Sequence, residues 1–171
     1  MAQRMVGDMR REGAPREVAP TDRRRTLWSG VMIGIGLAGT LDEVVLHQLL
    51  HWHHLYDRST QAVGLVSDGI FHIVSTALLV WGVMRVWDDR TRPYAGWVRR
   101  LVAGICLGAG GFNLYDATIQ HKLLRLHQVR PEASNWLPYD IAFIGGAALV
   151  LLVGLVLLRG TAAPASGHGD A

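Results

Sequence analysis

An uninterrupted apolar segment near the C-terminal end constrains this chain more than any other feature. It reads IAFIGGAALVLLVGLVLL from Ile141 to Leu158 and contains no charged side chain. A helix needs about 20 apolar residues to cross a bilayer, so this segment and its flanks predict a transmembrane helix. Three further apolar stretches have similar lengths. We therefore expect four transmembrane helices, over about residues 27–52, 63–87, 97–124 and 137–158.

These spans predict an all-α membrane protein, a four-transmembrane-helix bundle that occupies residues 27–159. Only 18% of the residues are charged, compared with about 25% in soluble domains. The polar residues 1–26 and 160–171 have no pattern that could pack, so we expect disordered tails there, the first of them basic and cytoplasmic. The single cysteine excludes an intramolecular disulfide.

Most of the 17 Lys and Arg residues lie on one side of the expected spans. They occupy residues 1–26, the link between the second and third spans, and Arg159, whereas the other two links carry only four. Basic loops resist translocation, so both termini should be cytoplasmic, in a multi-pass protein of the plasma membrane. The basic character is then a topology signal, and we expect the lipid bilayer rather than nucleic acid as the partner.

The chain contains an internal repeat with an offset of 74 residues. The segment GLAGTLDEVVLHQLLHWHH in the first span aligns with GGFNLYDATIQHKLLRLHQ in the third. The aligned pairs are Asp42 with Asp116, His47 with His121, His53 with His127 and, after a two-residue gap, Asp68 with Asp140. We therefore expect two repeated helical hairpins related by a pseudo-twofold axis along the membrane normal.

Several acids and histidines lie within the expected spans or at their ends. An acid at the centre of a lipid-facing helix costs about 2.5–3.5 kcal/mol, so these groups should face the interior and be paired, hydrated or metal-bound. At about 1.5 Å per residue they fall in the outer half of the bundle, which predicts one shared site. The principal candidate metal ligands are Asp42, His47, Asp68, His72, Asp116 and His121. The secondary candidates are Glu43, His51, His53, His54, His127 and Asp140.

Helical geometry divides the polar residues of the first span between two faces. At about 100° per residue, Glu43 and His47 share one stripe, whereas Asp42 and His53 form another. An ideal helix cannot direct both stripes at one centre. Either the helix deviates around residues 39–40, or one stripe faces the outer mouth. The repeat favours Asp42 and His47 for the core, with the HWHH motif as an access or capping feature.

Three interpretations fit the polar set. A transition metal ion such as Zn, Cu or Fe suits neutral imidazole and carboxylate ligands, which helical bundles supply from facing helices. A structural cluster would instead pair Asp with His and fix the register of the helices. The third is a proton or ion relay, or a b-type haem with His47 and His121 as axial ligands. Below Asp42 and Asp116 the spans are mainly Gly and apolar, which argues against a complete proton path.

A metal-dependent membrane hydrolase is a further alternative. A metal-bound water would be activated, with Glu43 or Asp42 as base, and a laterally or outwardly open cavity would be needed at the site. The sequence contains no nucleophile elbow, HExxH or Walker motif, so it assigns no catalytic residue and leaves open whether the chain is an enzyme.

Glycines recur four residues apart in the first and third spans. Gly104 and Gly108 in the third span correspond to Gly30 and Gly34 in the first. Small residues at this spacing let helices approach closely in lipid. We therefore expect the first and third spans to touch.

The motifs LHQLLHWHH, SDGIFH and NLYDATIQHKLLRLHQ stand in order along the chain. Over residues 28–158 the chain resembles a bacterial family of small predicted integral membrane proteins of unknown function, marked by LHQxLxWHH, SDGxFH and YDxxxxHKLL. The resemblance implies four spans and supports the polar candidates as the family's characteristic residues. Members are thought to occur beside respiratory oxidase and copper-assembly proteins, which implies an accessory role in respiratory metalloenzyme assembly, with a membrane protein partner. A homo-oligomer is left open.

Overall fold

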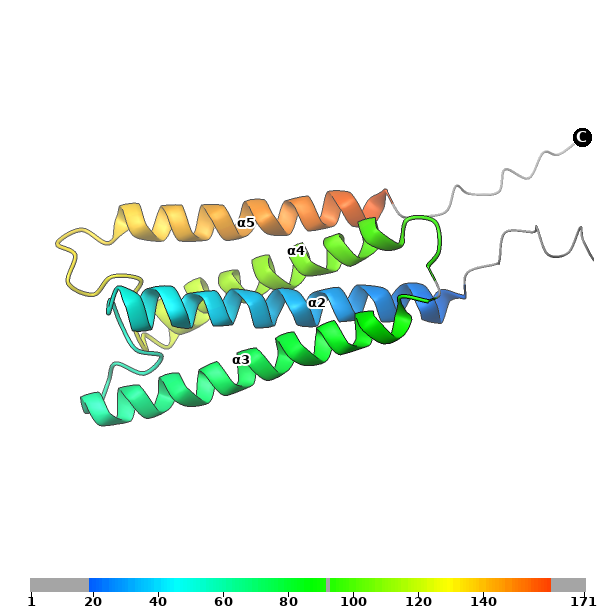
Figure 1. Cartoon of the computed structure of the whole chain (residues 1–171). Helices are drawn as coiled ribbons and strands as arrows, with labels where there is room; N and C mark the ends of the chain where they lie inside the picture. Colours follow the sequence, from blue (N-terminus) through cyan, green and yellow to red (C-terminus); the bar gives the residue numbers. More distant parts are fainter. Residues whose placement is uncertain (1–18, 92, 161–171) are drawn as a thin grey trace, which may run out of the picture.

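A computed structural model describes residues 19–91 and 93–160, and every regular element within these ranges is a helix (Figure 1). The first rod consists of α2 (Pro20–Asp42), which continues as a π-helix, η1 (Glu43–Leu49). The second is α3 (Gln61–Asp89). The third consists of α4 (Trp97–Tyr115) and its π-helical continuation η2 (Asp116–Leu123), and the fourth is α5 (Leu137–Arg159).

Three of these rods are long and apolar enough to cross a membrane, namely Pro20–Leu49, Gln61–Asp89 and Leu137–Arg159. The α4 rod is less apolar because Arg99, Asn113 and its π-helical end lie within it. Many large apolar side chains of α5 are exposed, among them Leu149 and Leu152, as expected of a helix that contacts lipid.

The helices pack as a row, in the order α3, α2, α4, α5 (Figure 1). The described residues include contacts of α2 with α3 and α4, and of α4 with α5, but none between α3 and α5. The predicted bundle is therefore open on one side, since its two outer helices do not meet. Both π-helical ends and both long loops lie at the same end of the molecule (Figure 1).

Glycines bring α2 and α4 into direct backbone contact, which confirms the expected meeting of these helices. A Cβ atom added to Gly30 would collide with the carbonyl oxygen of Leu101, and one added to Gly104 with that of Leu27. Gly34 and Gly108 have the same relation to the next turn of the facing helix. The contacts are reciprocal at the repeat offset of 74 residues.

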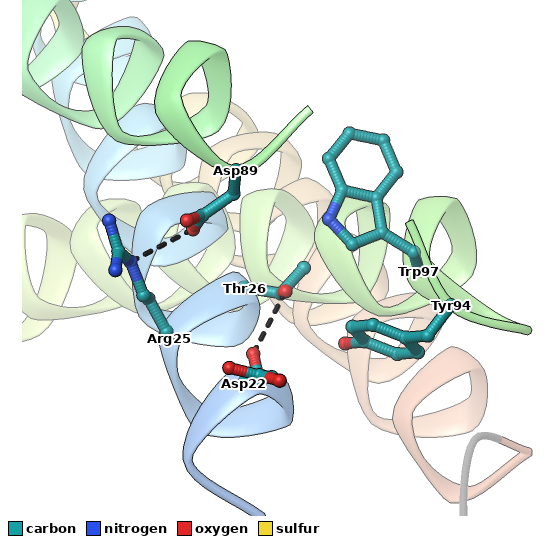
Figure 2. A pocket seen from close by; sticks show the side chains of 6 residues that line it. All are labelled: Asp22, Arg25, Thr26, Asp89, Tyr94 and Trp97. Carbon is teal, nitrogen blue, oxygen red and sulfur yellow. Dashed lines mark hydrogen bonds and ion pairs between the residues drawn. The ribbon is translucent and has the colours of Figure 1, made fainter. Parts of the chain in front are cut away.

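The helix α2 begins at Pro20, inside the segment 1–26 that the sequence predicted as a disordered tail. Proline suits the first turn of a helix because its missing N–H has no partner there. The hydroxyl of Thr26 donates to the carbonyl oxygen of Asp22 at 3.0 Å, and Arg25 pairs with Asp89 at 3.0 Å, which ties α2 to the end of α3 (Figure 2). The rest of the predicted tails, 1–18 and 161–171, lies outside the described residues.

Candidate metal centre

The π-helical ends of α2 and α4 redirect the polar side chains. In the first, the amide of Leu50 donates to the carbonyl of Val45 at 2.9 Å; in the second, Leu124 donates to Ile119 at 2.7 Å. These are i to i+5 bonds, which widen the turn and change the angle between successive side chains. The expected deviation of the helix therefore occurs, but at Glu43–Leu49 rather than around residues 39–40.

A left-handed residue follows each π-helix and reverses the chain. His51 and Arg125, equivalent in the repeat, both have a φ of 51°. Only glycine adopts this region without strain, so these two positions mark a specified turn. The turn carries the next histidines, His53 and His127, back into the interior, where both are buried.

Four imidazoles consequently meet at one place, from both halves of the chain. The rings of His53 and His127 stack, with centroids 4.6 Å apart and planes 8° from parallel. His47 meets His53 edge-on at 4.6 Å, and His121 meets His127 edge-on at 4.4 Å. All four are buried. The histidines predicted for the core are therefore joined by His53 and His127, which had been expected in secondary positions.

Backbone carbonyls determine the tautomers of the two stacked rings. Nδ1 of His53 lies 3.0 Å from the carbonyl oxygen of Val129, and Nδ1 of His127 lies 3.0 Å from that of Leu55. A carbonyl oxygen can only accept a hydrogen bond, so each Nδ1 donates its proton. In the neutral ring, Nε2 then has a free lone pair. Both Nε2 atoms are buried and have no hydrogen-bond partner. In metal-binding histidines, the ring nitrogen that does not bind the metal typically donates to a carbonyl or carboxylate oxygen in this way.

Two carboxylates flank the rings in equivalent positions. Asp42 Oδ2 lies 3.6 Å from His47 Nε2. On the other side, Asp116 Oδ2 lies 3.0 Å from His121 Nε2, and its Oδ1 lies 3.5 Å from His127 Nε2. The contact between Asp116 and His121 is short but does not have hydrogen-bond geometry. Both nitrogens of the His121 ring therefore lack a hydrogen-bond partner.

Candidate ligand atoms of three residues lie within 4.8 Å of one another in two groups at this centre. One group is His53, His121 and His127; the other is Asp42, His47 and His53. Burial, followed by the neighbouring imidazoles, lowers the pKa of His53 to about 2, so this ring stays neutral. Burial opposes a charge on His127 as well, but Asp116 raises the pKa of that ring above its ordinary value.

A third group lies on the other side of His47 and consists of Glu43, His47 and Asp68. Nδ1 of His47 is 2.8 Å from Glu43 Oε2 and 3.1 Å from Asp68 Oδ1. Asp68 also accepts from the amide of Leu55 at 2.7 Å and contacts His54 Nδ1 at 2.6 Å. His47 thus has a different set of neighbours at each nitrogen.

Three predicted residues do not reach the cluster. His72 is exposed on α3, where its carbonyl oxygen accepts a hydrogen bond from the hydroxyl of Ser75. His51 is exposed at the left-handed turn. Asp140 contacts the ammonium of Lys122 at 2.6 Å instead. The signal that identifies His53 and His127 is the repeat itself, which aligns them as a pair.

The chemistry of this donor set suits a borderline metal ion. Neutral imidazoles and carboxylates are ligands for Zn, Fe, Mn and Cu(II), and thiolate or thioether ligands are not part of the groups. A haem between His47 and His121 does not fit, because neighbouring imidazoles contact one another at 4.4–4.6 Å and leave no space for a porphyrin.

A family model described as "Predicted membrane protein (DUF2243)" matches residues 29–161, which include the whole cluster. No curated protein and no solved structure matches the chain. The match covers most of the sequence, and it agrees with the resemblance carried by the LHQLLHWHH and SDGIFH motifs. The chain therefore belongs to this family of predicted membrane proteins.

Proposed function

We propose that this membrane protein binds a transition metal ion, Zn, Cu or Fe, through His47, His53, His121 and His127 together with Asp42 and Asp116. The observation that carries the proposal is the pair of buried Nε2 atoms on His53 and His127, neither of which has a hydrogen-bond partner, although Asp116 Oδ1 lies 3.5 Å from that of His127. Each ring is oriented by a carbonyl of the other hairpin. A buried polar atom without a partner costs about 1–3 kcal/mol, and a bound cation would recover that energy.

The proposal includes the topology. In it, α4 also crosses the bilayer, as the third of four spans, the two hairpins are related by a pseudo-twofold axis, both termini are cytoplasmic, and the cluster lies near the outer face. The reciprocal glycine contacts and the paired π-helices support the axis. Asp68 and Asp116 are buried, which supports membrane spans that keep their polar groups away from lipid.

An access route for an ion supports the same assignment. A groove of about 520 Å³ at the loop end reaches His127 and is lined by Asp57 and Glu132 among others. Arg58 and Arg125 line the same groove, so its two carboxylates are balanced by two guanidinium groups, and the route is supported by its position at His127 rather than by charge. A partner that donates or receives the metal would approach from this side, in keeping with an accessory role in respiratory metalloenzyme assembly.

Metal analysis of the purified protein in detergent tests the proposal. We expect a metal ion in the wild-type chain, and its loss in His53→Ala and His127→Ala. His72→Ala is the matched control, since this exposed histidine lies outside the cluster and its replacement should leave the metal content unchanged. Cu(II) electron paramagnetic resonance provides a second readout, because nitrogen hyperfine coupling should weaken in the cluster variants only.

A chain that stays folded and metal-free after incubation with Zn, Cu and Fe salts would contradict the proposal. The Asp and His groups would then form a structural cluster. Size-exclusion chromatography separates this outcome from simple unfolding of the variants.

A groove beside Asp42 favours a second candidate, the metal-dependent membrane hydrolase. It has a volume of about 380 Å³ and is lined mainly by apolar residues, including Leu41 and Phe143, so a lipid-like substrate could reach the half-buried Asp42 from the side. The candidate predicts that metal-loaded protein hydrolyses a hydrophobic p-nitrophenyl ester and that Asp42→Asn stops the reaction but retains the metal. Equal hydrolysis by the metal-free protein would exclude it.

A further inference from the structure

The two halves of the chain differ next to the shared cluster, and the second half acts as an internal comparison for the first. In the second half, the ammonium of Lys122 lies 2.6 Å from Asp140 Oδ2 and 2.9 Å from Gln128 Oε1. A resident cation therefore neutralises that carboxylate. The position is half-exposed, and the arrangement needs no further ion.

The first half has the equivalent carboxylate but not the ammonium. At the repeat offset, Gln48 replaces Lys122, His54 replaces Gln128, and Glu43 replaces Ala117. One positive charge is lost and one negative charge is gained. Two carboxylates, Glu43 and Asp68, thus stand where the second half has one carboxylate and its ammonium.

These two carboxylates are more deeply buried than their counterpart. Glu43 and Asp68 are each 1% exposed. Oε1 of Glu43 accepts from the side chain of Gln48 at 2.8 Å, but Oε2 is buried without a hydrogen-bond partner. A pair of buried carboxylates is strongly unfavourable unless a cation is bound or protons are taken up. The ion-pair partners of Glu43 and Asp68 are the histidines His47 and His54.

Three ligand atoms, one each from Glu43, His47 and Asp68, lie within 4.8 Å of one another, close enough to bind one metal ion. Oε2 of Glu43 and Oδ1 of Asp68 lie 2.8 Å and 3.1 Å from Nδ1 of His47. Ligand atoms that each lie about 2.0–2.2 Å from one ion are separated by roughly 3 Å in common coordination geometries. The amide of Leu55 and the ring of His54 hold Asp68 in place, and metal-bound carboxylates are commonly held by hydrogen bonds of this kind.

We propose that Glu43, Asp68 and His47 bind a second divalent cation, in a site that the second half of the chain has replaced with Lys122. Two carboxylates and one imidazole suit Mn²⁺, Fe²⁺ or Zn²⁺, which are harder ions than Cu(I). The inference deepens the proposed function, since His47 faces this site through Nδ1 and the histidine centre through Nε2. To bind both ions the ring would bridge them as an imidazolate and release its N–H proton to solvent when the metal binds. The protein is then a two-ion centre with unequal sites.

Metal stoichiometry of the purified full chain in detergent tests the second site, with Mn²⁺ and Zn²⁺ as separate probes. We expect about two ions per chain in the wild type. Glu43→Ala and Gln48→Lys each copy a residue of the second half, and each should reduce the ratio by about one ion. Gln48→Ala is the matched control, because it removes the same amide without adding a charge, and it should keep both ions.

His127→Ala separates this inference from the proposed function. We expect it to lose the ion of the histidine centre and to retain the one at Glu43. A wild-type ratio near one that Glu43→Ala and Gln48→Lys leave unchanged, but that His127→Ala abolishes, would overturn the second site alone. One ion that survives His127→Ala but not Glu43→Ala would overturn the histidine centre alone. A ratio near zero in folded wild-type protein would overturn both.

Discussion

The backbone contact between α2 and α4 should control both stability and metal affinity, and Gly34→Ala tests this. A Cβ atom at Gly34 would lie 2.8 Å from the amide nitrogen of Ala109 and 2.9 Å from the carbonyl carbon of Ile105, and would overlap the oxygen of that carbonyl. Both neighbours are backbone, so the helices would have to separate by about 1 Å. Gly145→Ala on α5 is the control, because nothing lies within 4 Å of its Cβ position.

The comparison removes the effect of helix propensity. Replacing Gly with Ala favours a helix by about 1 kcal/mol at either position, whereas overpacking costs about 1–3 kcal/mol at Gly34 alone. We therefore expect Gly34→Ala to be less stable than Gly145→Ala by about 1–3 kcal/mol in thermal unfolding in detergent.

Metal affinity should respond more strongly than stability. His47 and His121 lie on η1 and η2, the continuations of the helices that Gly34 holds together, and His53 and His127 lie in the loops that follow them. Metal–ligand distances tolerate about 0.2 Å, so a separation of about 1 Å should weaken binding by about 10- to 100-fold. Isothermal titration with Zn²⁺ measures this. If Gly34→Ala and Gly145→Ala match in melting temperature and in affinity, the helix contact does not set the geometry of the site, and the reasoning fails.

Three further predictions concern the topology, the turns and the inner end. In a cysteine-free background, a membrane-impermeant maleimide added to intact cells should label Ser134→Cys but not Ala95→Cys, and the opposite pattern would reverse the proposed orientation. His51→Gly and Arg125→Gly should each raise the melting temperature, because glycine adopts a φ of 51° without strain and up to about 1 kcal/mol is recovered. A lower melting temperature would show instead that these side chains stabilise the turn. Arg25→Ala should cost at most about 1 kcal/mol in thermal unfolding, because its ion pair is partly exposed, and a larger loss would give the pair a structural role.

The hydropathy pattern predicted the rods well, because length and apolar content are properties of local sequence. It failed at the start of α2, where residues 20–26 are helical and Arg25 contacts Asp89, a residue far along the chain that local sequence does not report. It also could not predict that α3 and α5 stay apart, since no local signal reports which helices meet. The glycine spacing predicted that α2 and α4 meet, because small residues four apart mark the face of a helix that packs against another helix.

The candidate site was predicted in composition but not in geometry. Angles taken at 100° per residue assigned Asp42 and Glu43 to different faces, and only the π-helical turn lets both approach His47. At about 100° per residue, His72 lies only about 40° from Asp68 on α3. Among the described helices, however, α3 contacts α2 and its continuation η1, so its buried face is narrow and His72 already lies beyond the edge of that face.

The hydrogen bonds that cross between the halves also determine when the cluster can form during synthesis of the chain. His53 depends on the carbonyl of Val129, and His127 on that of Leu55, so neither hairpin can complete its own half of the cluster. A ribosome must add about 40 residues after Asp89 before Val129 exists, which at roughly 5–20 residues per second takes about 2–8 s. For that time His53 lacks the carbonyl that orients its ring, whereas Asp42, Glu43 and His47 already have their partners within the first hairpin. The site at Glu43, Asp68 and His47 could therefore form before the histidine centre.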